Sequence, residues 1–233
     1  MKVAIMQPYF LPYLGYFQLI EAVDRFVVYD NIEYTKKGWI NRNRMLVNGR
    51  DELFSLPLKK DSDYLDIKER TLADTFAKDG QKLLNKIRGA YGKAPHFQEV
   101  FPIVKGILEF EDSNLFSFLL NSLERVNAHL GLQTELVVSS TLDVDHSLKA
   151  QDRVIAICKH LGGAHYVNPP GGIDLYDREV FKNEGLELSF LQPSLTAYPQ
   201  RQHDFVPGLS ILDVMMFNSK ERIAALLDQY SVN

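Results

Sequence analysis

The sequence opens with Met1-Lys-Val-Ala-Ile-Met-Gln-Pro-Tyr-Phe-Leu-Pro-Tyr-Leu-Gly-Tyr-Phe-Gln18, in which a short apolar run leads directly into a loop of prolines, tyrosines and a glycine. The pattern predicts a strand over Val3–Met6 and a helix over Tyr16–Val23. The two prolines interrupt regular structure between them because they fix φ and lack an N–H group. A strand that leads through a rigid loop into a helix aims that loop at the carboxyl edge of an α/β sheet, where open sheets bind their ligands.

The loop after this first strand carries polar groups in a segment that otherwise favours burial. Those groups are Gln7, Tyr9 and Tyr13, and we predict that they bind a ligand. The alternative is an aromatic turn that only packs against the core. Gly15 follows, and the absence of a side chain there permits close packing of the helix on the strand.

The order of the remaining elements predicts the fold class. Arg25–Tyr29 is expected as a second strand, which makes a right-handed βαβ unit with the first. The C-terminal part of the chain alternates strands and helices with short links, which favours a mainly parallel, Rossmann-like α/β sheet with flanking helices. The strands expected there are Glu135–Ser139, His165–Asn168 and Leu186–Leu191, and the helices are Gln151–Leu161, Asp174–Asn183, Ile211–Phe217 and Lys220–Leu227.

The middle of the chain has a helical pattern and little strand signal. Residues 67–131 are predicted as a mostly helical insertion or cap on a single α/β domain spanning residues 1–233. The helices expected there are Asp79–Tyr91, Phe97–Ile107 and Ser113–Leu130, with Ser113 as an N-cap and Gly131 as a stop. Before this block, Asn31–Met45 is expected to be an irregular loop and Glu52–Leu58, with its proline, an edge strand.

Composition narrows the class of protein. Of 233 residues, 45% are hydrophobic and 24% charged, which are ordinary values for a soluble globular protein. The net charge of −4 gives no reason to expect a DNA or membrane surface. No apolar run approaches the roughly 20 residues of a membrane span, and no signal peptide is evident, so we expect a cytoplasmic protein. The single cysteine, Cys158, is expected to be a buried structural thiol. Assembly into a homo-oligomer stays open.

The densest polar cluster follows the second strand. Four cations surround the only tryptophan in a protein of net negative charge, and Arg and Lys side chains bind phosphate and carboxylate groups. We predict an anion-binding segment at the rim of the main pocket; the alternative is a solvated loop. Asp30, just before the cluster, is a catalytic candidate, and Lys59 and Lys60 are placed to join the patch. The predicted binding residues are Lys36, Lys37, Trp39, Asn41, Arg42, Asn43 and Arg44.

Two histidines are candidates for a general base. His146 lies just before a helix whose expected N-cap is Ser147, where the helix field favours the neutral imidazole. A simple capping segment is an equally good interpretation. His203 ends a polar run, Tyr198–His203, ahead of a helix capped by Ser210. Asp213 in that helix needs a partner, and the plain interpretation makes it a structural salt-bridge residue.

A third candidate is the turn Asn168-Pro-Pro-Gly-Gly172. Backbone N–H groups at a Gly-Gly turn before a helix can hold an anion, so Asn168, Gly171 and Gly172 join the predicted binding residues. We expect this turn and the loop Gln7–Tyr16 to converge, because both follow parallel strands. The usual nucleotide-loop signatures and metal-spaced ligand clusters are absent from the sequence, so we predict no metal and no cofactor.

Taken together, these motifs are similar to those of the WbqC-like protein family. The resemblance rests on Met6–Ile20, Lys37–Arg44, Tyr166–Gly172 with Leu175-Tyr176, and Pro207–Val214, and it covers nearly the whole chain in the expected order. It implies a place in bacterial O-antigen, lipopolysaccharide and other surface-polysaccharide biosynthesis. Transfer of glycine or another amino acid to an amino sugar has been suggested for the family.

We therefore expect a group transferase that acts on a nucleotide-linked amino sugar with an acyl or aminoacyl donor. The basic segment Lys36–Arg44 would hold the pyrophosphate, aromatic rings would hold the base or sugar, and His146 or His203 would take the proton of the sugar amine. Two alternatives stay open. The first is a HIGH-like, ATP-dependent adenylate-forming or nucleotidyl-transfer enzyme, although Pro12–Tyr16 contains no histidine. The second is a non-catalytic sugar- or nucleotide-binding module.

Overall fold

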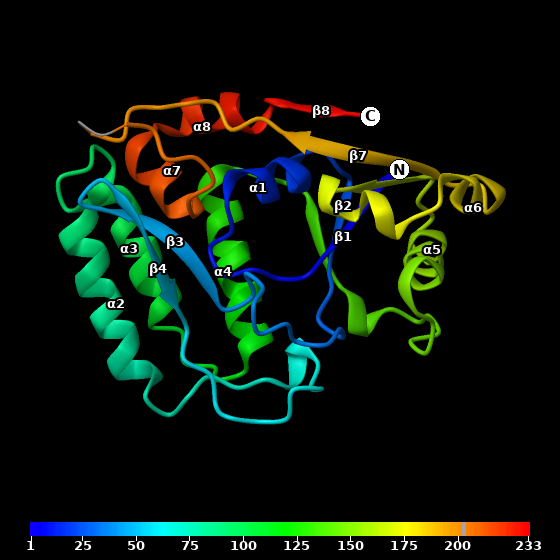
Figure 1. Cartoon of the computed structure of the whole chain (residues 1–233), viewed down its shortest axis with the longest axis horizontal. Helices are drawn as coiled ribbons and strands as arrows, with labels where there is room; N and C mark the ends of the chain where they lie inside the picture. Colours follow the sequence, from blue (N-terminus) through cyan, green and yellow to red (C-terminus); the bar gives the residue numbers. More distant parts are fainter. Residues whose placement is uncertain (202–203) are drawn as a thin grey trace.

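The central feature of the computed structural model is a six-stranded sheet in the order β5-β2-β1-β6-β7-β8 (Figure 1). The structure describes residues 1–201 and 204–233. Five strands are parallel, and the last pairs antiparallel with its neighbour. The predicted mainly parallel α/β sheet is therefore confirmed. The strands are β1 (Lys2–Met6), β2 (Arg25–Val28), β5 (Glu135–Val138), β6 (His165–Asn168), β7 (Glu187–Pro193) and β8 (Tyr230–Val232); β8 was not predicted.

The strand order reverses between β1 and β6. The chain builds β1, β2 and β5 in one direction and then returns to the other side of β1 for β6 and β7. In open α/β sheets the loops on either side of such a reversal separate and leave a crevice at the carboxyl edge. The loops after Met6 and Asn168 flank this point.

Helices cover both faces of the sheet (Figure 1). Alternate residues of a strand point to opposite faces, so Val3 and Ile5 pack with Cys158 and Phe181 on one side, whereas Ala4 packs on the other. Cys158 is fully buried, and burial raises the pKa of its thiol to about 12, which confirms a structural thiol. The helices are α5 (Ala150–His160) and α6 (Arg178–Asn183) on one face, and α1 (Leu14–Glu21), α7 (Ile211–Phe217) and α8 (Lys220–Leu227) on the other.

A helical block and a hairpin form the rest of the molecule. The block is α2 (Phe76–Tyr91), α3 (Phe97–Leu108) and α4 (Leu115–Leu130), as the helical pattern of the middle segment predicts. Beside it lies the antiparallel hairpin β3 (Arg42–Val47) and β4 (Arg50–Ser55). The Tyr91 hydroxyl accepts a hydrogen bond from the Leu46 N–H at 2.9 Å, which fixes the hairpin on α2.

The hairpin corrects two predictions. The end of the expected loop 31–45 is strand β3, and the expected edge strand 52–58 begins and ends earlier, as β4. The cause is the turn Asn48-Gly49, in which both residues have positive φ, 50° and 78°. This is the type I′ geometry that Asn-Gly favours between two strands, and it pairs Val47 with Arg50.

Helix boundaries differ from the predictions where another side chain provides the cap. Asn114, not Ser113, accepts the N-cap hydrogen bond of α4 from the Ser117 N–H, whereas Gly131 ends this helix at φ 77° as predicted. Residues 170–175 form a 3-10 helix, and α6 begins only after Asp177, whose carboxylate accepts from the Glu179 N–H at 2.8 Å. Within the described ranges, no helix combines the length and apolar character needed to cross a membrane.

Candidate functional site

The predicted binding residues gather most clearly around a cleft of about 230 Å³, which we call the Trp39 cleft. Its walls are mainly aromatic and aliphatic, and among the described residues one charged side chain, that of Arg44, lines it. The lining comes from segments far apart in sequence: Tyr9, Pro12 and Tyr13 after β1, Trp39, Asn43 and Arg44 at the start of β3, and Leu195 and Gly208 after β7. The last two were not predicted.

The loop after β1 is held in place by hydrogen bonds from distant residues. The Asn43 amide donates to the carbonyl oxygens of Phe10 and Leu11, at 3.1 and 2.7 Å. The Ser210 hydroxyl also donates to the Leu11 carbonyl at 2.7 Å. Leu11 has φ 44°, a left-handed conformation that costs about 1–3 kcal/mol for such a residue. These two donors offset that strain, and Asn43 therefore acts mainly as a structural anchor of the cleft.

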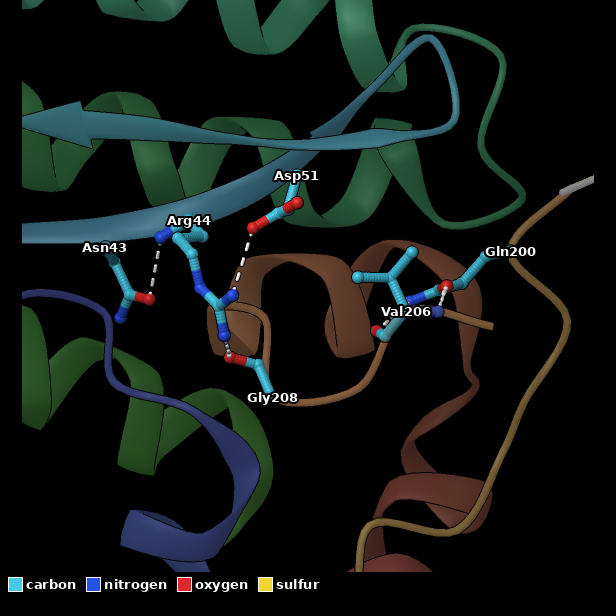
Figure 2. Close-up of polar contacts among 6 residues, drawn as sticks. All are labelled: Asn43, Arg44, Asp51, Gln200, Val206 and Gly208. Atoms are coloured by element: carbon cyan, nitrogen blue, oxygen red, sulfur yellow. Dashed lines mark hydrogen bonds and ion pairs between the residues drawn. The ribbon is translucent and has the colours of Figure 1, made fainter. Parts of the chain in front are cut away.

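Arg44 is positioned by three contacts, and Figure 2 shows the two polar ones, with Asp51 and Gly208. Its guanidinium forms an ion pair with Asp51 at 3.0 Å and donates to the Gly208 carbonyl at 3.2 Å. The guanidinium carbon lies 5.7 Å from the centre of the Trp39 ring. Its Nε is buried and has no hydrogen-bond partner among the described residues. The cleft thus has one fixed cation against an aromatic wall.

Trp39 lines the cleft, whereas Arg42, also predicted to bind, does not. The Trp39 side chain is 40% exposed, and fully buried Ile40 anchors the segment. The Arg42 guanidinium lies 5.8 Å from the Trp39 ring centre and donates to the carbonyls of Gly38, at 2.9 Å, and Lys37. Arg42 therefore shapes the loop that carries Trp39, while Lys37 is exposed and outside the cleft lining.

The tyrosines of the cleft are hydrogen-bond donors rather than bases. Burial raises the pKa of both Tyr9 and Tyr13, so their hydroxyls stay protonated at neutral pH. A Cβ atom on Gly15 would lie only 2.5 Å from the Tyr13 ring. Gly15 is therefore needed because the Tyr13 ring folds over it, and this ring is the first group that a side chain at position 15 would meet. The Gln7 carbonyl accepts from the Tyr16 hydroxyl at 2.9 Å, which fixes the start of the same loop.

The predicted basic segment is divided between two hollows. Lys36 and Asn41 lie in a second, open hollow of about 550 Å³, which we call the Arg70 basin. Lys59 and Lys60 line this basin too, so they extend the patch as expected. Asn41 is used by the fold here, because its amide accepts from the Tyr34 hydroxyl and donates to the Leu56 carbonyl, both at 2.8 Å.

Asp30 and His146 lie together at the carboxyl end of β2, away from the lining of the Trp39 cleft. Buried Asp30 accepts the Ser140 N–H at 2.9 Å. His146 Nδ1 lies 3.1 Å from the Asn31 amide nitrogen and 3.0 Å from Arg153 Nη2. Both are donors, so Nδ1 accepts.

The other ring nitrogen of His146, Nε2, therefore carries the proton and donates to the Leu142 carbonyl at 3.1 Å. Both ring nitrogens are thus engaged by the protein. The expected N-cap of α5, Ser147, bonds Asp145 instead, and Lys149 occupies the N-cap position. His203, the other candidate base, lies outside the described residues.

The turn after β6 shares the sheet edge with the loop after β1 but adds no residue to the Trp39 cleft. Asn168 accepts from the Tyr166 hydroxyl at 2.9 Å. A Cβ on Gly172 would lie 1.8 Å from the Asn168 amide nitrogen, and the Gly172 N–H already donates to Pro169. Gly171 is exposed. The turn leads into a 3-10 helix, so the α-helix N-terminus predicted there is absent.

Asp213 has hydrogen-bonding partners rather than the predicted salt bridge. Its carboxylate accepts from Tyr91 at 2.9 Å and from Tyr198 and Gln200 at 2.7 Å each. Gln200 also exchanges two hydrogen bonds with the Val206 backbone, at 2.7 and 3.2 Å (Figure 2). The network fixes the segment that leads to Gly208 and the cleft.

Comparisons with known proteins agree with the sequence motifs. The model of the WbqC-like protein family matches residues 7–225. A protein of Mycobacterium tuberculosis (strain ATCC 25618 / H37Rv), named "Uncharacterized protein Rv1507c", is 29% identical over 221 residues, which cover 93% of each chain. No solved structure matches the sequence. Because the family model spans almost the whole chain, including every lining residue of the Trp39 cleft, the chain belongs to the WbqC-like protein family.

Proposed function

We propose that the chain is a group transferase of bacterial surface-polysaccharide biosynthesis and that it binds a nucleotide-linked amino sugar in the Trp39 cleft. One observation supports this most strongly: the exposed Trp39 ring has two guanidinium groups near it, at 5.7 and 5.8 Å from its centre, and lines an aromatic cleft. A flat or sugar ring can stack on Trp39 while the Arg44 guanidinium binds phosphate oxygens. Family membership and the resemblance described above favour the polysaccharide context.

The proposed reaction transfers glycine or another acyl or aminoacyl group to the sugar amine. The amine nitrogen forms a bond to the acyl carbon, the donor's leaving group departs with the bonding electrons, and a base takes the proton of the amine. We assign that base to His203, because both ring nitrogens of His146 are already hydrogen bonded. Tyr9 and Tyr13, whose hydroxyls stay protonated, would donate to sugar or phosphate oxygens.

The test is incubation of the protein with a panel of nucleotide-linked amino sugars and acyl or aminoacyl donors, followed by mass spectrometry. We expect an amino sugar whose mass has increased by one acyl group. Trp39→Ala and Arg44→Gln should lower the affinity for the sugar nucleotide, whereas Leu175→Ala, an exposed residue outside the cleft, should not. His203→Ala should abolish turnover but spare binding, and His146→Ala should not. Binding without turnover by any donor would refute the transferase and favour a binding module.

A second candidate function is supported by the sheet order. Many nucleotide-binding α/β folds hold their ligand where the strand order reverses, and here the order reverses between β1 and β6. We propose as the alternative a HIGH-like enzyme that activates a carboxylate with ATP. Release of pyrophosphate that depends on both ATP and a carboxylic acid would favour it over direct group transfer. Unchanged ATP after incubation with a broad panel of acids would exclude it.

A further inference from the structure

The Arg70 basin contains a buried cation that the proposed function does not use. Arg70 is 5% exposed, and its guanidinium carbon lies 4.7 Å from the centre of the Tyr34 ring. It donates one hydrogen bond, to the Ser62 carbonyl at 2.7 Å. Its Nε is buried without a partner, and no carboxylate of the described residues lies within 4.0 Å of it.

Such an arrangement is costly unless an anion completes it. A buried charge is normally paired, because removing it from water costs several kcal/mol. Anchoring a loop through one carbonyl needs only a neutral donor, so the single bond to Ser62 does not explain an arginine. The guanidinium lines an open basin of about 550 Å³, which is within the usual size of small-molecule sites.

The lysines around the basin differ in what they are free to bind. Lys36 forms an ion pair with Asp63 at 2.5 Å, and Lys59 with Asp74 at 2.8 Å. Lys60 has no acidic partner within 4.0 Å in the part of the chain that the structure describes. Exposed Lys60 and buried Arg70 are therefore the cations of the described basin lining that are available to a ligand.

The basin also has an exposed aromatic side chain. Tyr64 is 84% exposed, the largest exposure among the large hydrophobic side chains of the described residues that lie on the surface. Exposed aromatic rings beside cations are the usual platform for the bases of nucleotides.

We propose that the Arg70 basin is a second binding site, for a nucleoside phosphate. Arg70 and Lys60 bind the phosphate, and the base stacks on Tyr64. The Arg70 basin and the Trp39 cleft share no lining residue. The inference therefore does not depend on the proposed function, although a transferase with two substrates would need a second site of this kind.

The probe is adenosine 5′-monophosphate, titrated calorimetrically into the wild-type protein, with ribose 5-phosphate and adenosine as partial ligands. Lys60→Ala should lower the affinity for both the nucleotide and the sugar phosphate about tenfold, the scale of a charge-assisted hydrogen bond. Tyr64→Ala should lower the affinity for the nucleotide about fivefold or more, the scale of one stacked base. The affinity for ribose 5-phosphate should stay unchanged, because this ligand has no base. Both residues are exposed, so both variants should melt like the wild type.

Three further variants test whether the nucleotide binds in the Arg70 basin. Lys93→Ala removes an exposed lysine outside the basin and should bind normally. Trp39→Ala should still bind the nucleotide at the Arg70 basin, and loss of binding in this variant alone would place the ligand in the Trp39 cleft and overturn the inference. Arg70→Lys keeps the charge without the two-pronged geometry and should lose affinity while folded. The site would be refuted if the wild type did not bind adenosine 5′-monophosphate, or if it bound adenosine just as tightly. It would also be refuted if neither Lys60→Ala nor Tyr64→Ala changed the affinity for the nucleotide.

Discussion

At the scale of single residues, Gly15 shows how one missing side chain shapes the cleft. A Cβ at this position would meet the Tyr13 ring at 2.5–2.7 Å, which is the movable end of a half-buried side chain rather than backbone. We expect Gly15→Ala to fold, because the gain in helix propensity of about 1 kcal/mol offsets part of the clash. Tyr13 should turn away and reduce affinity for nucleotide-linked sugars in a calorimetric titration.

The matched control for Gly15→Ala is Gly89→Ala in α2, where a Cβ would meet nothing within 4 Å. It should raise stability by roughly 0.5–1 kcal/mol in a thermal or urea melt and leave binding unchanged. Unaltered affinity of Gly15→Ala for every ligand that the wild type binds would show that Tyr13 has no part in the cleft's function.

Asp213 predicts a pH dependence of stability. Burial raises the pKa of its carboxyl above the ordinary value of 3.8, although hydrogen bonds from Tyr198, Gln200 and Tyr91 oppose the shift. The folded state therefore holds this proton more tightly than the unfolded state. The resulting stability is fully present below about pH 4 and is lost as the pH rises through the folded-state pKa. The advantage of wild type over Asp213→Asn should thus shrink as the pH rises, as measured by urea unfolding.

Asp145 provides a control of opposite sign. Hydrogen bonds from Ser147 lower the pKa of its exposed carboxyl, so its contribution is lost as the pH falls through the folded-state pKa. The difference between wild type and Asp145→Asn should grow with rising pH. A difference between wild type and Asp213→Asn that grows in the same way would contradict the account of the Asp213 network.

At the scale of elements, Arg42 links the start of β3 to the loop that presents Trp39. Arg42→Ala removes the hydrogen bonds to the Gly38 and Lys37 carbonyls, so we expect a looser Trp39 loop in an otherwise intact fold. The binding free energy for a nucleotide-linked sugar should become less favourable by about 1.5–3 kcal/mol. Trp39 is the only tryptophan, so its fluorescence reports the loop directly. Unfolding of the variant, or unchanged affinity and emission, would contradict this role.

Elements with strong local signals were predictable, and those defined by distant partners were not. Apolar runs and glycine stops identified the parallel strands and the helices of the middle block. The Asn48-Gly49 turn is a strong hairpin signal, although no hairpin was predicted there, and β8 is too short to carry a pattern. The predicted N-caps Ser113 and Ser147 were wrong, because Asn114 and Lys149 occupy those positions.

At the scale of the whole molecule, the site is a product of long-range packing. Clusters of polar and aromatic residues in the sequence predicted a binding role for Tyr9, Tyr13, Trp39 and Arg44. No local pattern shows that Leu195 and Gly208 complete the same cleft, or that Arg70 rather than Lys37 is the buried cation. Division of the basic segment into two hollows likewise follows from how the loop folds, which periodicity does not encode.

The hydrogen bonds that hold the loop after β1 to a distant part of the chain have a consequence for its synthesis. Leu11 keeps its left-handed backbone because Ser210 donates to its carbonyl, and the Pro12 carbonyl accepts the Ile211 N–H at 2.8 Å. Both contacts join residues about two hundred positions apart. A growing chain therefore lacks a finished cleft until the ribosome has released residue 211. Newly made protein gains ligand binding in one late step, and nascent chains halted before that residue should bind nothing in the cleft.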